Sequence, residues 1–242
     1  MNKRNLIIVG TYNEVENIEI LIGRIFKYIK DCFVLVIDDG SPDGTAKVVR
    51  DLMRSNPNIE LLQRSTKLGL GSAYKLGFKW GLQREFKNII HMDADLSHRV
   101  RDLSKLIATK ESESQAGLVI GSRWIKGGST MNWPFRRQAL SRCANKYVRF
   151  MLGVKTYDST AGFRLYDRDS LEILDLDSVV SEGYAFHIEL TRELTKLGVK
   201  IVEVPIVFRE RAAGVSKMSK KIVREAMTLV TVWGLKRFLH LK

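Results

Sequence analysis

The sequence predicts an α/β fold in which a mostly parallel sheet is covered by helices on both faces. Three observations support this: short apolar runs recur, amphipathic helical patterns separate them, and polar clusters follow the runs. The 242 residues suffice for one domain with a buried core, and 45% are hydrophobic against 28% charged. Disorder and a disulfide scaffold are therefore excluded, and with two cysteines a reducing compartment is expected.

Five apolar strands are expected in the first half of the chain, each rich in Ile, Val, Leu or Phe, as buried parallel strands are. They cover residues 5–9, 33–37, 59–63, 88–92 and 118–121. Helices with apolar residues at three- and four-residue spacing are expected at 14–28, 44–54 and 71–84. Ligands bind beyond the carboxyl ends of such strands, so the residues that follow each strand are the candidates for a site.

The second half is less regular. Helices are expected at 137–152, 185–197 and 220–241, and strands at 163–166 and 200–208. The last of these strands carries Pro205, which favours a sheet edge. No repeat, low-complexity tract or linker interrupts the chain, so a single domain is expected.

Basic residues outnumber acidic ones by 40 to 27, a net charge of +13. The excess is clustered: residues 123–149 hold seven basic and no acidic side chains, and residues 196–242 hold eleven basic and three acidic. This pattern indicates an anionic partner, which is a phosphorylated substrate, a membrane surface or nucleic acid. The first apolar run is too short for a signal peptide, so a cytoplasmic location is expected.

Two carboxylates directly follow the strand at 88–92. Asp93 and Asp95 are one residue apart, so they project the same way if the chain stays extended. A divalent cation would remove the repulsion between them, and oxygen ligands favour Mg²⁺ or Mn²⁺, which commonly bridges to a diphosphate. The alternatives are an acidic helix cap and a zinc site with His91 and His98, for which nothing else supplies a closed ligand set.

A second polar turn, Asp38-Asp39-Gly40-Ser41-Pro42-Asp43, follows the strand at 33–37. As structure alone it is a common exit from a strand into a helix, whereas in a site Asp38 or Asp39 would grip a base or a ribose hydroxyl. Gly69-Leu70-Gly71 matches neither the Walker pattern nor the dinucleotide fingerprint. A P-loop ATPase and a nicotinamide enzyme are therefore disfavoured, and a nucleic-acid-binding protein leaves Asp93 and Asp95 unexplained.

Further motifs complete a series across residues 6–226: Thr11-Tyr12-Asn13-Glu14, Lys67-Leu68-Gly69-Leu70-Gly71, Asp93-Ala94-Asp95-Leu96-Ser97-His98, Gly121-Ser122-Arg123, Asn132-Trp133-Pro134, Thr160-Ala161-Gly162-Phe163-Arg164 and Gly214-Val215-Ser216-Lys217-Met218. Together with the Asp38–Thr45 turn, this series resembles the polyprenyl (dolichyl) phosphate mannose synthases of glycosyltransferase family 2. The double-Asp motif alone fits many nucleotide-sugar transferases, but the full series is far more specific. The resemblance implies a GT-A fold, GDP-mannose as donor, a polyprenyl or dolichyl monophosphate as acceptor, and inversion.

The resemblance also implies roles for individual residues. Nucleotide-sugar contacts fall on Gly10, Tyr12, Glu14, Ile37, Asp39, Lys67, Asp93, Ala94, Asp95, Arg123, Arg211 and Lys217. The metal ligands, for Mg²⁺ or Mn²⁺, are Asp93, Asp95 and Ser97, and the acceptor-phosphate contacts are Arg123, Arg137 and Ser141. Asp95, Arg123 and Lys217 are the expected catalytic residues. Two positions depart from the family pattern: Gly10 replaces a usual Pro, and Ser97 replaces a usual Gln, which leaves direct coordination by Ser97 open.

The chemistry that this resemblance implies suits the residues. A phosphate monoester, with a second pKa near ~6, is already a nucleophile at neutral pH, so no general base is needed. Arginines offer bidentate phosphate contacts, and the loop at 209–219, with Gly214 as a hinge and Lys217 as a point charge, suits a lid. The alternative is a soluble family-2 transferase that uses another nucleotide sugar, such as UDP-glucose, or a hydroxyl acceptor, which needs a carboxylate base.

The C-terminal segment is the expected membrane contact. Its longest uncharged stretch, residues 226–235, would span ~15 Å as a helix at ~1.5 Å per residue, against ~30 Å of hydrocarbon core, so it cannot cross a bilayer. Apolar side chains flanked by lysine and arginine predict a helix in the membrane interface, with packing on the enzyme's own core as the alternative.

The domain is therefore expected to comprise a GT-A catalytic part, residues 1–219, and an amphipathic interface helix, residues 220–242. The expected location is the cytoplasmic face of a membrane, held peripherally and without a nucleic-acid partner. The sequence leaves open whether a small membrane subunit assists.

Overall fold

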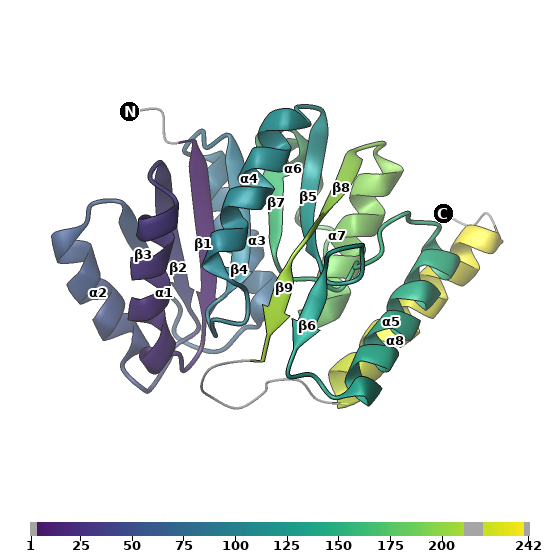
Figure 1. Cartoon of the computed structure of the whole chain (residues 1–242), viewed down its shortest axis with the longest axis horizontal. Coiled ribbons are helices and arrows are strands. Elements are labelled where there is room, and N and C mark those ends of the chain that lie inside the picture. Colours follow the sequence, from purple (N-terminus) through teal and green to yellow (C-terminus); the bar gives the residue numbers. More distant parts are fainter. Residues whose placement is uncertain (1–3, 211–219, 240–242) are drawn as a thin grey trace.

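The central element of the protein is a seven-stranded sheet of order β3-β2-β1-β4-β7-β5-β8 (Figure 1). The computed structural model of the chain describes residues 4–210 and 220–239. β7 alone runs antiparallel to its neighbours β4 and β5, and the other pairs are parallel, so the predicted mostly parallel sheet is confirmed. The strands are β1 (Asn5–Thr11), β2 (Cys32–Asp38), β3 (Ile59–Gln63), β4 (Asn88–Asp93), β5 (Ala116–Ser122), β7 (Arg164–Asp167) and β8 (Lys200–Pro205).

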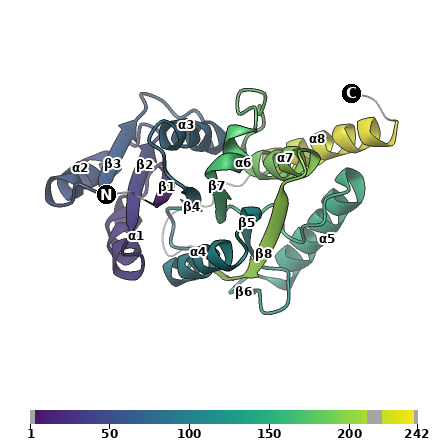
Figure 2. The ribbon, with the colours of Figure 1, turned by 90° about the horizontal axis from the view of Figure 1, so that it is seen from above.

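Helices cover both faces of the sheet (Figure 2). One face carries α1 (Val15–Tyr28), α2 (Thr45–Ser55) and α4 (Leu103–Ser112), and the other carries α3 (Leu70–Leu82), α6 (Arg168–Glu172) and α7 (Gly183–Lys196). Alternate residues of β1 point to opposite sides, so Val9 joins the core with α1 while Ile8 joins the core with α3. Burial on both sides explains why these strands read as continuous apolar runs.

The strand expected at 200–208 divides at Pro205, and this corrects the sequence prediction. β8 ends there, and β9 (Val207–Arg209) leaves the sheet to pair in parallel with β6 (Ser129–Met131). Proline lacks the N–H that would continue the ladder, and the next N–H, of Ile206, donates to the carbonyl of Ser122 at 3.1 Å. The short 3₁₀ turn η1 (Val100–Asp102), α4, α6 and β6 were not predicted.

Two long helices, α5 (Phe135–Leu152) and α8 (Lys220–Phe238), lie side by side at one end of the molecule (Figure 1). A small apolar cluster joins them to α7 through Val148, Ile188 and Val230, and the Tyr147 hydroxyl bonds that of Thr231 at 2.8 Å. None of the helices in the described part of the chain is both long and apolar enough to cross a membrane. The contacts of Val230 and Thr231 show that one face of α8 packs on the protein, as one of the two interpretations of the C-terminal segment predicted.

Candidate active site

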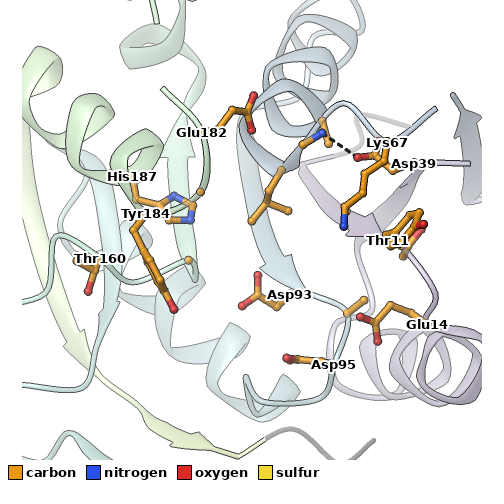
Figure 3. A pocket seen from close by; sticks show the side chains of 18 of the residues that line it. Thr11, Glu14, Asp39, Lys67, Asp93, Asp95, Thr160, Glu182, Tyr184 and His187 are labelled. Atoms are coloured by element: carbon orange, nitrogen blue, oxygen red, sulfur yellow. Dashed lines mark hydrogen bonds between the residues drawn. The ribbon is translucent and has the colours of Figure 1, made fainter. Parts of the chain in front are cut away.

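A cavity of about 350 Å³ opens beyond the carboxyl ends of β1, β2 and β4, the edge at which the sequence predicts a site (Figure 3). Residues that follow each of these strands line it: Thr11 after β1, Asp39 after β2, and Asp93 and Asp95 after β4. The opposite wall comes from later in the chain and carries Tyr184. The predicted contacts Gly10, Tyr12, Glu14, Asp39, Lys67, Asp93, Ala94 and Asp95 all line this cavity.

One side of the cavity is suited to a nucleoside. The Lys67 ammonium lies 4.2 Å from the centre of the Tyr12 ring, and both residues line the cavity, where Figure 3 shows Lys67. Asp39 accepts the Gly69 N–H at 3.1 Å and pairs with Arg64. An oriented carboxylate beside an aromatic ring is a common way to hold a base and its ribose hydroxyls.

The structure separates Asp38 from Asp39. The Asp38 side chain is fully buried and accepts bonds from the Ser41 N–H at 2.9 Å and the Thr11 hydroxyl at 3.0 Å, so it builds the turn. Asp39 lines the cavity and is the candidate for a ligand contact. Ile37, also predicted as a contact, is fully buried in the core beside α3 and does not line the cavity.

The carboxylates of Asp93 and Asp95 project into the centre of the cavity (Figure 3). β4 ends at Asp93, and Leu96 takes a left-handed conformation with φ of +60°, which turns the chain sharply. Within this turn the Ser97 N–H donates a hydrogen bond to the Asp95 carboxylate at 3.1 Å. A backbone conformation that non-glycine residues rarely adopt thus holds the carboxylate pair in place.

The donor set at this turn fits a divalent ion that also binds a substrate. In the described parts of the chain no three His, Cys, Asp or Glu side chains are close enough to hold a metal by themselves. Mg²⁺ and similar ions, however, are usually bound by one or two carboxylates together with substrate phosphates and water. The buried Ser97 hydroxyl makes no hydrogen bond with any described residue and is a further candidate oxygen.

Two buried side chains, Tyr74 and His98, form hydrogen bonds at the start of the carboxylate turn. The Tyr74 hydroxyl donates to the carbonyl of Met92 at 3.2 Å and lies 3.5 Å from Asp93. Burial, followed by the charges of Asp93 and Asp95, raises the Tyr74 pKa well above its usual value, so the hydroxyl keeps its proton. Burial lowers the pKa of His98 to about 4, and its Nδ1 accepts the Asp93 N–H at 3.3 Å.

The far wall of the cavity was not predicted from residue patterns. Thr160 and Gly162 belong to the segment before β7, and Glu182, Tyr184 and His187 belong to the start of α7. The motif at residues 160–164, which includes Thr160 and Gly162, was the signal for the first of these segments, and the second had none.

The fully buried Arg164 fastens these two segments together. It donates to the carbonyls of Ser159 at 2.6 Å, Ala161 at 2.7 Å and His187 at 2.9 Å. Burial, followed by the charge of Arg164, lowers the pKa of His187 well below its usual value. The His187 imidazole in the wall is therefore neutral.

A second connection ties α7 to the glycine-rich turn before α3. The Glu182 carboxylate accepts the N–H groups of Gly71 at 2.7 Å and Ser72 at 2.9 Å, which are unpaired donors of the first turn of α3. Gly69 lies against this carboxylate with a left-handed φ of +103°, so a side chain there would be strained and would also clash. The glycines therefore allow close packing between this turn and Glu182.

Arg123 lies behind the cavity wall and does not line the cavity itself. Its Nε and Nη2 bond both oxygens of the fully buried Asp158 at 2.7 and 2.6 Å, and Nη2 also donates to the Thr160 hydroxyl at 2.9 Å. Burial alone would lower the Arg123 pKa, but the charge and hydrogen bonds of Asp158, together with the charges of Tyr184 and Asp93, outweigh it and raise the pKa. The Asp158 N–H donates to Glu203 of β8 at 2.9 Å. Neither acidic residue was predicted.

The two other predicted contacts of the acceptor phosphate, Arg137 and Ser141, do not line the donor cavity. Arg137 and Ser141 are on the first turns of α5, where the Arg137 guanidinium stacks 3.9 Å from the Trp133 ring and bonds Glu210 at 3.1 Å. The Ser141 carbonyl accepts a bond from Asn145. Arg211, Lys217 and the proposed hinge Gly214 lie outside the described residues.

Comparison with known proteins identifies the family of the chain. Residues 6–174 match the family described as glycosyl transferase family 2. The chain is 46% identical, over 97% of its length and 88% of the relative, to the polyprenol monophosphomannose synthase of Mycolicibacterium smegmatis. It is 45% identical, over 96% of its length and 94% of the relative, to the undecaprenyl-phosphate mannosyltransferase of Micrococcus luteus.

The fold is also found among solved structures. A mannosyltransferase of Pyrobaculum calidifontis, solved in complex with GDP-Man and Mn²⁺, aligns with a TM-score of 0.62 at 18% identity. The alignment covers 100% of this chain and 66% of that one, and it confirms the predicted GT-A fold. A family match over more than two thirds of the sequence, two close relatives and the fold agree: the chain belongs to glycosyltransferase family 2.

Proposed function

We propose that the protein transfers mannose from GDP-mannose to a polyprenyl monophosphate with inversion, giving polyprenyl phosphate mannose and GDP. The observation that carries this proposal is the 45–46% identity, over nearly the whole chain, to two relatives named for polyprenyl phosphate mannosylation. The donor cavity and the arginines near α5 support it, because the reaction needs a place for a nucleoside diphosphate and another for an anionic acceptor.

On the donor side, Tyr12, Asp39 and Lys67 hold the guanosine, and Asp93 and Asp95 face the diphosphate. A divalent ion at these carboxylates, Mg²⁺ or Mn²⁺, supplies charge neutralisation for the departing diphosphate. Ser97 orients the turn and offers its hydroxyl to the same ion. In this proposal Arg211 and Lys217 contact the diphosphate when the sugar nucleotide is bound.

On the acceptor side, Arg123, Arg137 and Ser141 bind the phosphate of the lipid. One phosphate oxygen attacks C1 of mannose, and the bond from C1 to the β-phosphate oxygen breaks, with its electron pair leaving on GDP. Attack from the face opposite the leaving group inverts C1. The acceptor phosphate is already ionised near pH 7, so the residues bind and orient it without removing a proton.

The lipid acceptor requires access to a membrane, and α5 and α8 offer a surface for it. We call the outer sides of these two helices the α5–α8 face; its exposed apolar residues are Phe135, Leu140, Phe150, Val232, Leu235, Phe238 and Leu239. Exposed Arg136, Lys146 and Lys236 accompany them, as expected for contact with anionic headgroups. We propose that this face rests peripherally on the cytoplasmic side of the membrane.

The test is a transfer assay with purified protein and no second polypeptide. Labelled GDP-mannose and UDP-glucose are each offered with polyprenyl phosphate or with a hydroxyl acceptor, in Mg²⁺, Mn²⁺ or EDTA. We expect mannose transfer to the phosphate only, no transfer in EDTA, and a product cleaved by mild acid, as a glycosyl phosphate is. Transfer to the hydroxyl acceptor, or from UDP-glucose alone, contradicts the proposal. Activity only after a membrane subunit is added would establish that subunit as a partner.

A further inference from the structure

We infer that Trp133 is a positioning residue for the acceptor phosphate: its ring holds the guanidinium of Arg137 in place relative to that of Arg123. This inference rests on the proposed function, in which both arginines bind that phosphate. It adds a residue whose side chain brings no charge to the phosphate and acts through the arginines beside it.

The geometry around Trp133 supports this role. The ring is 8% exposed, and the guanidinium carbon of Arg137 lies 3.9 Å from its centroid, while that of Arg123 lies 5.4 Å away. Both distances are within the range of cation–π attraction. Two positively charged guanidinium groups are thus held beside one aromatic ring. This arrangement suits the binding of a doubly charged phosphate.

The two arginines differ in what fixes them. Arg123 is buried, and two bonds to Asp158 set the plane of its guanidinium. Arg137 is partly exposed, and besides Trp133 its guanidinium pairs, among the residues that the structure describes, with Glu210, whose side chain is itself about half exposed. A long side chain loses considerable rotamer entropy when it is ordered. Contact with the buried ring restricts Arg137 in advance, so less of that entropy is lost when the phosphate binds.

Trp133 is itself held by aromatic packing that reaches the carboxylate turn. Phe208 of β9 packs edge-on against Trp133, with ring centroids 5.4 Å apart, and also against His98, at 5.1 Å. His98 is the residue whose Nδ1 accepts the Asp93 N–H. The acceptor arginines and the donor carboxylates are therefore positioned by one continuous set of rings.

The indole N–H of Trp133 is buried and makes no hydrogen bond with any residue that the structure describes. The ring therefore acts through its face, and Trp133→Phe removes ring area without breaking a hydrogen bond. The chain offers a matched control: Trp80 of α3 has the Arg84 guanidinium at the same 3.9 Å, and neither residue lines the cavity. Trp80→Phe makes the same substitution at the same kind of contact.

The experiment measures initial rates of transfer while polyprenyl phosphate is varied at saturating GDP-mannose, and the reverse, with GDP binding and thermal melting alongside. Because phenylalanine keeps a smaller and weaker π face, we expect Trp133→Phe to raise the KM for polyprenyl phosphate by about two- to fivefold. The KM for GDP-mannose and the affinity for GDP should stay as in the wild type. Trp80→Phe should change none of these. If Trp133→Phe does not fold, Trp133→Tyr takes its place.

A second measurement asks whether Trp133 acts through Arg137. If it does, Trp133→Phe combined with Arg137→Gln raises the acceptor KM no further than Arg137→Gln alone, whereas independent effects add. Additive effects, equal changes for donor and acceptor, or a Trp133→Phe variant that matches Trp80→Phe each overturn the inference. These results require a wild type that transfers mannose to the lipid phosphate; a wild type that does not would instead overturn the proposed function.

Discussion

Arg123 and Asp158 form a buried ion pair behind the cavity wall, so neither buried charge lacks a partner. Breaking such a pair from one side leaves an uncompensated buried charge. We therefore expect Asp158→Asn to lower the free energy of unfolding by about 3–5 kcal/mol. Urea unfolding measures this loss.

The double variant Arg123→Met with Asp158→Leu tests whether the stability lost in Asp158→Asn comes from the unpaired charge or from altered packing. Apolar replacement of a whole pair is often neutral for stability, so the double variant should be more stable than Asp158→Asn while inactive in transfer. A double variant less stable than Asp158→Asn would contradict this account of the pair.

Asp93 and Asp95 are expected to be needed for transfer and not for folding. Asp95→Ala should abolish mannose transfer and Asp93→Ala should reduce it less severely, while melting without metal changes little, because the removal of like charges offsets the lost bond from the Ser97 N–H. Mn²⁺ with GDP should raise the melting temperature of the wild type but not of Asp95→Ala. Asp51→Ala, on the exposed side of α2, is the control. Activity of Asp95→Ala within about tenfold of the wild type, ~1.4 kcal/mol of barrier, would refute the assignment.

The residues that could be predicted are those that follow a strand. Asp39, Asp93 and Asp95 stand directly after apolar runs, and parallel strands bring their carboxyl ends to one edge. Tyr184 and His187 could not be found this way, because they start a helix that reaches the cavity only through tertiary packing. Asp158 was missed for a similar reason: its role depends on Arg123, 35 residues away.

At the scale of elements, Asp102 joins the start of α4 to β9. It is 1% exposed, bonds Arg99 at 3.0 Å and Lys105 at 2.9 Å, and accepts the Val207 N–H at 3.4 Å. Burial alone would raise the Asp102 pKa, but the bonds from Arg99 and Lys105 outweigh it and lower the pKa. A carboxyl with a lowered pKa in the folded state stabilises the protein above its unfolded pKa, ~3.9, and this is lost as the pH falls below that value.

Asp102→Asn should therefore lower the free energy of unfolding at pH 7 by about 1.5–3 kcal/mol, the range for a hydrogen bond to a charged group. The difference from the wild type should shrink as the pH falls below ~3.9, where the wild-type carboxyl also becomes neutral. Urea unfolding of both proteins from pH 7 to pH 3 measures it, with Asp51→Asn as control. A difference that is constant across this range would show that the charge of Asp102 contributes nothing.

Elements with long, buried patterns could be predicted, and short ones could not. β1, β2 and β4 are apolar on both faces, so they appear in the sequence as continuous runs. The antiparallel direction of β7 leaves no trace in four residues, and α6, at five residues, is too short to show a helical period. Pro205 did indicate the division between β8 and β9. Its missing N–H favours the end of a strand as much as a position at the edge of a sheet.

At the scale of the whole molecule, the basic excess and the exposed apolar residues meet at one end. α8 has its inner residues Ala226, Val230 and Gly234 buried, and its outer Leu235 and Phe238 exposed. The packing alternative for the C-terminal segment therefore holds for the inner face of α8, and the outer face is the one proposed to contact the membrane. Glu225 of the same helix lines the donor cavity, so the surface proposed for the lipid and the site of transfer are joined by a single element.

The last prediction concerns the α5–α8 face. Phe150 of α5 and Phe238 of α8 lie with ring centroids 5.9 Å apart and are 70% and 48% exposed, so replacing both with Ser removes apolar area without opening the core. Burial of each ring in the interface contributes about 1.5–3 kcal/mol, so binding to anionic liposomes should fall by at least about tenfold. Melting and GDP affinity should not change. Ile20→Ser with Tyr28→Ser on α1, each 47% exposed, is the matched control. Undiminished liposome binding by the first pair would exclude this face as the membrane contact.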